Sequence, residues 1–442
     1  MVEALTKAVQ AASDAVWGPW TIALLFGTGV FLTWRFRLVQ LTRLPEALRT
    51  LKPRAADGAV GAISPFQAFM TGLGASVGTG NIAGVATAIV TGGPGAVFWI
   101  WAYGFFATTI KLAEAVLAMR FRAAEGSGLS TGPMHYLRDG LGMPKLGMAY
   151  ALIAGIASLT TTPFTQTNSI AVVFHSELGV PAWVTGLVLA ALTWLVMIGG
   201  VGSIGRAAER ITPAMVLLYL GGGIVVLVAF AGRIPGVFAL IFREAFSTQA
   251  AAGGAAGTAM MLAVRYGLAR GIYANEAGYG TAAVAYGSAR SDRPVQQGLN
   301  AMMEVYIVSF VTSSVSALTI LVAGVAGSGL KSTALVAQAF AEVIPFGGLV
   351  VLVSALLFGY TTLIGWGYYG EQFLSYVFGS RVVLPYRWIY CGLAVFGATT
   401  SVDLVWAWGD LMNGLQIFPN LVGVLGLSGL VATALREDRA KR

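Results

Sequence analysis

One apolar segment of the chain contains a dense group of residues that could bind an ion or a small ligand. Residues 64–92 read SPFQAFMTGLGASVGTGNIAGVATAIVTG, which is long enough to cross a membrane. The middle of this segment, residues 74–81, holds three glycines, two hydroxyl side chains and an asparagine, and this composition disfavours a continuous helix. A helix interrupted there would offer N–H groups to an anion and carbonyl groups to a cation. We therefore predict a binding site at this interruption.

The composition of the whole chain indicates a membrane protein. Of its 442 residues, 57% are hydrophobic and 10% are charged, whereas a soluble protein has about 25% charged residues. In hydrocarbon an unpaired backbone group is costly, so an interrupted helix is tolerated only inside protein or beside a polar cavity. The single cysteine, Cys391, excludes an intrachain disulfide and a cysteine-based metal site. The two histidines, His135 and His175, lack metal-ligand spacing and are predicted to be structural or exposed.

Eleven apolar segments are long enough to be membrane-spanning helices. They lie near residues 17–35, 64–91, 95–121, 145–175, 181–200, 211–231, 257–288, 294–324, 346–378, 384–400 and 404–435. The residues before the first segment include Glu3, Lys7 and Asp14 and lack the apolar core of a cleaved signal peptide. We predict a short amphipathic segment there and an all-α polytopic membrane protein overall.

The distribution of the 27 lysines and arginines predicts the orientation of these helices. Twenty of them fall in loops on one side of the predicted membrane, and basic loops are retained in the cytoplasm. The exceptions are Lys7, Arg233, Arg243 and Lys331 on the other side, and Lys111, Arg265 and Arg270 within helices. This bias places the N-terminus outside and the C-terminus in the cytoplasm of a multi-pass protein of the plasma (inner) membrane. It also explains the net charge of +8 without a nucleic-acid partner.

The ten helices after the first fall into two groups of five that enter the membrane from opposite sides. The predicted units are 1–63 (external lead, extra helix and basic loop), 64–231 (first repeat), 232–256 (external connection) and 257–442 (second repeat and cytoplasmic tail). The first helix of the second repeat contains GIYANEAG at residues 271–278, a second group of glycines and polar residues. Interrupted helices at matching positions of inverted repeats indicate the binding site of a secondary transporter. Glycine-rich packing faces are the alternative, but they do not explain Asn81, Asn275 and Glu276 at this depth.

Charged residues inside the predicted helices suggest local ion pairs. Lys111 and Glu114 are three residues apart on one helix, so they can pair on one face near its cytoplasmic end. Arg270 and Glu276 flank the second interruption, where an ion pair could fix the end of a half-helix.

Polar residues elsewhere in the helices suggest a site for a hard cation and show no sign of catalysis. Thr361 and Thr362 lie in the middle of one helix, and residues 165–168, TQTN, form a polar run in another. Several oxygen ligands of this kind suit sodium. The sequence has no G-x-S-x-G motif, phosphate-binding loop or paired-histidine motif, so we predict that the protein is not an enzyme.

Several motifs in the chain resemble the alanine/glycine:cation symporter family. They are VGTGNIAGVATAI at 77–89, GGPGAVFWIW at 92–101, ARGIYANEAGYGTAAVA at 269–285, TTLIGWGYYGE at 361–371 and NGLQIFPNL at 413–421. The resemblance implies a leucine-transporter-like fold of two inverted five-helix repeats, helices 2–11, preceded by one extra helix. It also implies sodium-driven uptake of small neutral amino acids, chiefly alanine and glycine, without an organic cofactor.

The resemblance also implies roles for individual residues. N–H groups at 79–81 would hold the substrate carboxylate, and carbonyl groups at 271–273 would receive its ammonium group. The substrate-binding residues implied are Thr79, Gly80, Asn81, Gln166, Gly271, Ile272, Tyr273, Asn275 and Trp366. The sodium ligands implied are the carbonyl groups of Gly74 and Val77 and the hydroxyl groups of Thr361 and Thr362.

Two departures from the family pattern and two alternatives accompany this interpretation. The family commonly has a histidine where this chain has Ala285-Tyr286-Gly287, and Thr162-Pro163-Phe164 replaces a pattern of small residues beside Gln166. The first alternative is a proton-coupled carrier that uses Glu276, Glu304 or Glu371, the last two being predicted near cytoplasmic helix ends. The second is a channel or an amino-acid sensor of the same fold.

Overall fold

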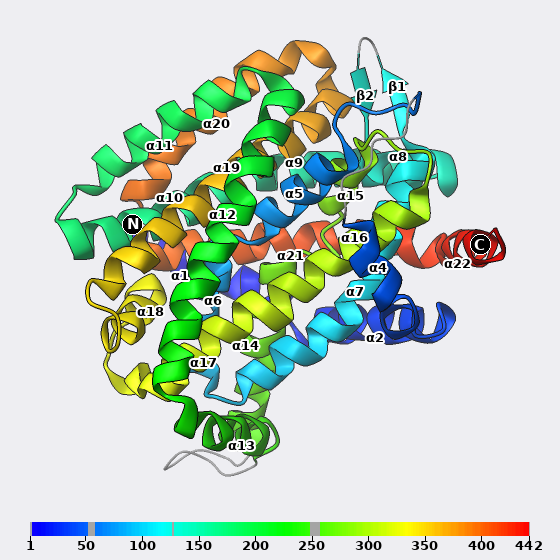
Figure 1. Cartoon of the computed structure of the whole chain (residues 1–442). Coiled ribbons are helices and arrows are strands. Elements are labelled where there is room, and N and C mark those ends of the chain that lie inside the picture. The colour runs from blue at the N-terminus through cyan, green and yellow to red at the C-terminus, as the bar shows by residue number, and fades with distance from the viewer. Residues whose placement is uncertain (1, 52–57, 126–127, 248–256, 442) are drawn as a thin grey trace.

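The computed structural model describes residues 2–51, 58–125, 128–247 and 257–441, and most of these residues are helical. Long helices pack side by side into one bundle (Figure 1). The sheet found among the described residues is one short antiparallel hairpin of β1 (Ala123–Glu125) and β2 (Gly128–Ser130). The prediction of an all-α protein is therefore confirmed.

Most helix bounds lie near those of the predicted segments, but α12 begins at Gly200, well before the predicted start at 211, and several predicted segments are divided between two helices. The helices before residue 248 are α1 (Val2–Val16), α2 (Pro19–Arg35), α3 (Val39–Thr42), α4 (Leu44–Thr50), α5 (Pro65–Ser76), α6 (Ala83–Gly92), α7 (Ala96–Phe121), α8 (Pro133–His135), α9 (Pro144–Thr160), α10 (Thr162–Leu178), α11 (Ala182–Met197), α12 (Gly200–Ala229) and α13 (Ile234–Ala245). The later helices are α14 (Gly257–Asn275), α15 (Ala282–Gly287), α16 (Pro294–Val305), α17 (Ser313–Ala323), α18 (Ser332–Ala341), α19 (Gly347–Phe378), α20 (Val383–Thr399), α21 (Val402–Gly426) and α22 (Ser428–Ala440).

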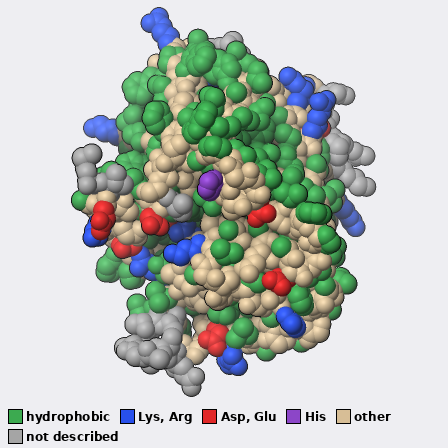
Figure 2. All heavy atoms as spheres, turned by 90° about the vertical axis from the view of Figure 1, so that its left-hand side faces the viewer, with side chains coloured by type: hydrophobic (Ala, Val, Ile, Leu, Met, Phe, Trp, Pro, Cys, Tyr) green, Lys and Arg blue, Asp and Glu red, His purple; other side chains and the backbone are tan. Residues whose placement is uncertain are grey.

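The lengths and composition of these helices are those of a multi-pass membrane protein. In the described part of the chain, six helices are long and apolar enough to cross a membrane, or up to nine if each bent pair is one span. Hydrophobic side chains cover the upper part of the face in Figure 2. Large apolar side chains such as Leu217 and Val228 are about 70% exposed, at 71% and 70%, as expected for contact with lipid. The count of eleven spans, the inverted repeats and the orientation remain predictions.

The first predicted interruption is present. Ser64 caps the start of α5, because its hydroxyl accepts the N–H of Gln67 while the Gln67 side chain accepts the N–H of Ser64. Helix α5 then ends at Ser76, a single turn of 3-10 helix follows, and α6 starts at Ala83. The two halves are bent by 55°. The composition of residues 74–81 thus predicted a real break in the helix.

The second interruption lies further along the chain than its predicted start at Gly271. Helix α14 continues to Asn275, and the N–H of Glu276 still donates to the carbonyl of Ile272 at 2.9 Å. Left-handed backbone at Glu276 (φ 56°), Gly278 (φ 96°) and Gly280 (φ 81°) then ends the helix. Residues 271–273 therefore belong to a regular helix, and the carbonyl of Ile272, predicted to be exposed, is bonded to the N–H of Glu276 instead.

The two broken segments lie together at the centre of the bundle. Helix α7 packs against both α14 and α16, and α6 packs against α14. Helix α5 is covered by α12 and α19 (Figure 1). The connection predicted at 232–256 contains helix α13. The last nine residues of this connection, 248–256, lie outside the described ranges.

Candidate functional site

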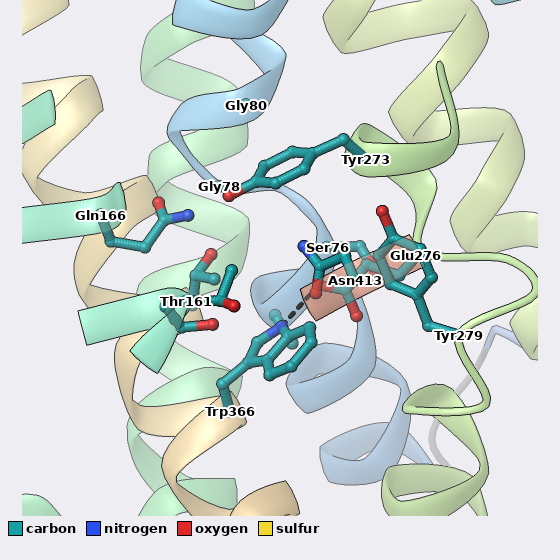
Figure 3. A pocket seen from close by; sticks show the side chains of 13 residues that line it. Ser76, Gly78, Gly80, Thr161, Gln166, Tyr273, Glu276, Tyr279, Trp366 and Asn413 are labelled. Atoms are coloured by element: carbon teal, nitrogen blue, oxygen red, sulfur yellow. Dashed lines mark hydrogen bonds between the residues drawn. The ribbon is translucent and has the colours of Figure 1, made fainter. Parts of the chain in front are cut away.

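A narrow cavity lies between the two broken segments (Figure 3). It is lined by Ala75, Ser76, Gly78, Gly80, Thr161, Thr162, Gln166, Tyr273, Glu276, Tyr279, Thr362, Trp366 and Asn413. The centre of a water molecule can move through only about 10 Å³ of it, which is the smallest space that holds one water. An amino acid would therefore enter only if these side chains move apart.

The break between α5 and α6 forms one wall of the cavity. The N–H and the hydroxyl of Thr79 both donate to Oε1 of Gln166, at 3.0 and 2.9 Å. This bond carries the Gln166 side chain from α10 to the break, where Figure 3 shows it facing the labelled glycines. A Cβ atom on Gly78 would lie 2.6 Å from the hydroxyl oxygen of Thr362, so this approach requires glycine.

Gly80 provides a direct test of the close approach on this wall. A Cβ atom there would lie 2.8 Å from Cδ1 of Tyr273, whose hydroxyl is held by Thr165 at 2.9 Å. We expect Gly80→Ala to weaken binding of alanine, the substrate that the resemblance implies, about tenfold or more, because overpacking costs about 1–3 kcal/mol. Binding of radiolabelled alanine to the purified protein measures this. Gly221→Ala is the matched control, since no atom lies within 4 Å of its added Cβ, and equal binding by both variants would contradict the prediction.

The opposite wall carries a carboxyl group. The indole N–H of Trp366 donates to Oε1 of Glu276 at 2.6 Å, and the hydroxyl of Thr281 donates to Oε2 at 2.8 Å. Glu276 is only 5% exposed, yet it borders the cavity. An acidic group in this position could receive a substrate ammonium group.

The predicted ion pair between Arg270 and Glu276 is wrong. Arg270 instead makes a two-pronged contact with Asp410 of α21, at 3.1 and 2.8 Å. Because α14 continues as a helix past Arg270, the guanidinium group projects towards α21. The Glu276 carboxyl group therefore has no contact with Arg270 and borders the cavity.

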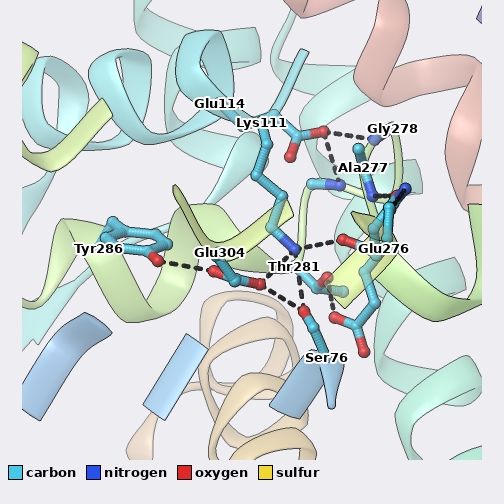
Figure 4. A network of polar contacts seen from close by, with 12 residues as sticks. Ser76, Lys111, Glu114, Glu276, Ala277, Gly278, Thr281, Tyr286 and Glu304 are labelled. Atoms are coloured by element: carbon cyan, nitrogen blue, oxygen red, sulfur yellow. Dashed lines mark hydrogen bonds and ion pairs between the residues drawn. The ribbon is translucent and has the colours of Figure 1, made fainter. Parts of the chain in front are cut away.

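A buried lysine connects both interruptions (Figure 4). The ammonium group of Lys111 lies 2.7 Å from Glu304 Oε1, 3.0 Å from the Ser76 hydroxyl and 2.5 Å from the Asn275 carbonyl oxygen. Ser76 and Asn275 are the last residues of α5 and α14, and helix C-termini favour positive charge. Ser76 and Tyr286 also donate hydrogen bonds to Glu304, the latter at 2.6 Å. Tyr286 thus lies in the stretch 285–287, where the resemblance led us to expect a histidine.

The predicted pairing of Lys111 with Glu114 is wrong. Glu114 Oε1 accepts the N–H groups of Gly278 and Gly280, at 3.0 and 3.1 Å, and the side-chain amide of Asn420 at 2.7 Å. Lys111 and Glu114 therefore hold different parts of the broken helices. Lys111 contacts the ends of two half-helices and is fully buried.

Three of the four predicted sodium ligands come together beside the first break. The hydroxyl of Thr362 donates to the Gly74 carbonyl at 3.1 Å, and a Cβ on Gly74 would lie 3.2 Å from Cβ of Thr361. The Thr361 hydroxyl bonds to the carbonyls of its own helix at Leu357 and Phe358, both at 3.0 Å. Val77 follows the last residue of α5. All four predicted ligand atoms are oxygens, so this set of ligands fits a hard cation such as sodium.

Several predicted substrate residues lie behind the cavity wall. The Asn81 amide nitrogen donates to the Ser76 carbonyl at 2.9 Å, and its oxygen accepts the Ser313 hydroxyl at 3.0 Å. Asn275 likewise donates to Ser309 at 3.2 Å. Both asparagines therefore join the breaks to the helix that follows residue 294. The predicted substrate residues that do not line the cavity are Thr79, Asn81, Gly271, Ile272 and Asn275, whereas Gly80, Gln166, Tyr273 and Trp366 do. Of the predicted sodium ligands, Thr362 lines it.

Comparison with known proteins finds relatives along the whole chain. A model of the sodium:alanine symporter family matches residues 2–442. The sodium/alanine symporter AgcS of Methanococcus maripaludis is 41% identical over 98% of each chain. The probable sodium/glutamine symporter GlnT of Bacillus subtilis is 35% identical over 99% of this chain and 91% of GlnT. The crystal structure of MhsT in complex with L-phenylalanine shares the fold, with a TM-score of 0.61 at 14% identity over 86% of this chain and 97% of MhsT.

Proposed function

The chain belongs to the sodium:alanine symporter family, whose members couple amino-acid transport to sodium, and we propose that its substrates are alanine and glycine. It carries them into the cell across the plasma membrane, with its N-terminus outside and its C-terminus in the cytoplasm. The observation that supports a small substrate best is the narrow cavity, in which Gly78 and Gly80 leave no room for added side-chain atoms.

Each end of the substrate has a suitable partner in this proposal. The carboxylate binds at the break between α5 and α6, where Gln166 contacts the N–H of Thr79. The ammonium group binds towards Glu276, whose carboxyl group borders the cavity, rather than towards carbonyl groups of α14. Trp366 limits the length of the substrate side chain from the opposite wall.

Sodium binds beside this pocket and makes one conformation more stable than the other. Its ligands are the carbonyls of Gly74 in α5 and of Val77 directly after α5, together with the hydroxyls of Thr361 and Thr362 in α19. Binding that favours a single arrangement of these helices shifts the population between outward and inward states. The ion therefore drives substrate movement without a change in covalent bonds.

Proton coupling is the second candidate mechanism. The contacts of the three candidate carboxylates leave one of them, Glu276, as the residue that could carry the proton. Glu304 is paired with Lys111, and Glu371 is paired with Arg387 at 2.8 Å. No lysine or arginine of the described ranges lies within 4.0 Å of the Glu276 carboxyl group, which also borders the cavity. Glu276 is therefore the group to carry a proton if sodium does not drive transport.

His135 does not compete for this role. It lies in the segment between α7 and α9, with its Nε2 2.7 Å from the Ser130 hydroxyl. Burial, with the nearby charge of Arg138, lowers the pKa of His135 to about 4. The imidazole is neutral at physiological pH and has a structural role.

Uptake into proteoliposomes tests the proposed function. We expect radiolabelled alanine to accumulate under an inward sodium gradient and not under a proton gradient in potassium buffer. Unlabelled glycine should compete, and phenylalanine should not. If alanine accumulates under a proton gradient alone, and Glu276→Gln abolishes this accumulation, the protein is coupled to protons and not to sodium. Failure of folded protein to accumulate alanine under either gradient would overturn the substrate assignment.

A further inference from the structure

A basic groove lies at the end of α2, far from the cavity between the broken helices. It is formed by residues 35–43, which include the end of α2 and the start of α3, and by α22, which contacts α2 (Figure 1). Its volume is about 540 Å³. Five arginines line it: Arg35, Arg37, Arg43, Arg436 and Arg439. We call this feature the arginine groove.

Arg43 is the buried anchor of the arginine groove. It is only 5% exposed, and its Nε and one terminal nitrogen contact Glu46 at 2.8 and 2.6 Å, with a further contact to Asp438. Its other terminal nitrogen, Nη1, is buried and has no hydrogen-bond partner in the described ranges. A buried donor without an acceptor is costly. This nitrogen is therefore suited to an acceptor supplied from outside the chain.

The remaining four arginines add charge that the described residues do not neutralise. Arg35, Arg37, Arg436 and Arg439 are exposed, and no described carboxylate lies within 4.0 Å of their guanidinium groups. Since Glu46 and Asp438 are occupied by Arg43, the groove carries excess positive charge. Guanidinium groups bind phosphate oxygens in two-pronged geometry.

The position of the groove and its apolar residues distinguish a lipid from a soluble anion. Arg35 is the last residue of α2, an apolar helix of the bundle, so the groove lies where hydrocarbon ends. Phe36, Val39 and Leu435 line the same groove. The exposed Trp34 side chain (75%) lies beside it in sequence, as is typical of interfacial residues. A soluble anion such as free phosphate has no apolar group that would contact these residues.

We propose that the arginine groove binds the phosphodiester headgroup of an anionic phospholipid from the cytoplasmic leaflet. The phosphate accepts hydrogen bonds from Nη1 of Arg43 and from the exposed arginines, and the acyl chains extend along the exposed side of α2. Basic pockets between helices on the cytoplasmic side are suited to such headgroups.

Lipid titration of the purified protein in mixed micelles tests the proposal. We expect dioleoyl phosphatidylglycerol to raise the midpoint of thermal unfolding in a saturable way, and dioleoyl phosphatidylcholine not to do so. Arg436→Gln with Arg439→Gln should weaken the apparent phosphatidylglycerol affinity roughly tenfold or more, since each basic residue near an anionic membrane contributes about a fivefold factor. Arg43 is left intact because its contacts to Glu46 and Asp438 support the fold.

Arg206→Gln with Arg210→Gln is the matched control, because these arginines are exposed on α12 and lie outside the groove. The control should retain wild-type affinity. An equal response to phosphatidylcholine, or equal loss in both double variants, would overturn the proposal. Saturation of the same stabilisation by inorganic phosphate would also overturn it, by showing a site for a free anion.

Discussion

Replacing Lys111 by methionine is expected to abolish alanine uptake and to lower the free energy of unfolding by about 3–5 kcal/mol. The ammonium group and the Glu304 carboxylate are both fully buried, 2.7 Å apart. Without the lysine, the carboxylate is left with neutral donors and the Asn275 carbonyl loses its charged partner. The ends of α5 and α14 are then no longer joined. Uptake in proteoliposomes and thermal unfolding in detergent measure the two effects.

A double variant separates the loss of the ion pair from the loss of the connection. Lys111→Met with Glu304→Met removes both buried charges, so much of the lost stability should return. Uptake should stay absent, because no group then bridges the two half-helices. Lys331→Met is the control, since Lys331 is exposed and precedes α18. Wild-type stability and uptake in the Lys111→Met protein would contradict the role assigned to this lysine.

The position of the first break could be predicted from the sequence because its cause is local. Glycines and hydroxyl residues at 74–81 disfavour helix wherever they are placed. The second break depends on contacts that sequence spacing does not reveal. Gly271 is accommodated in α14, which ends at Asn275. The left-handed turn that follows is held by Glu114 from another helix, which accepts the N–H groups of Gly278 and Gly280.

The wrongly predicted ion pairs have the same cause. The three-residue spacing of Lys111 and Glu114 allows a pair, but in a buried bundle each group finds partners on other helices.

Of the cavity residues, Gln166, Tyr273 and Trp366 were found through the family resemblance. Asn413 was missed, although its polar side chain in the apolar segment 404–435 was a usable signal.

Replacing Thr361 and Thr362 together by valine is expected to raise the sodium concentration for half-maximal uptake about tenfold or more. Valine keeps the shape of threonine and removes the hydroxyl, and a polar contact to a charged partner contributes about 1.5–3 kcal/mol. Thr362 contacts the Gly74 carbonyl across the break, so this oxygen pair is where α19 meets α5. Alanine binding measured at saturating sodium should be much less affected than binding at low sodium.

Thr319→Val provides the matched control for this experiment. Thr319 is also fully buried, and its hydroxyl bonds to the carbonyl of Ser316 in its own helix at 3.0 Å. It lies in α17, outside the proposed ion site. Thr319→Val introduces a buried valine, as the Thr361 and Thr362 substitutions do, but it should leave the sodium dependence of uptake unchanged. If the Thr361 and Thr362 double variant behaves like this control, the ion does not bind between α5 and α19. If sodium activation weakens in the double variant alone, these two hydroxyls link sodium to the movement of the broken helix.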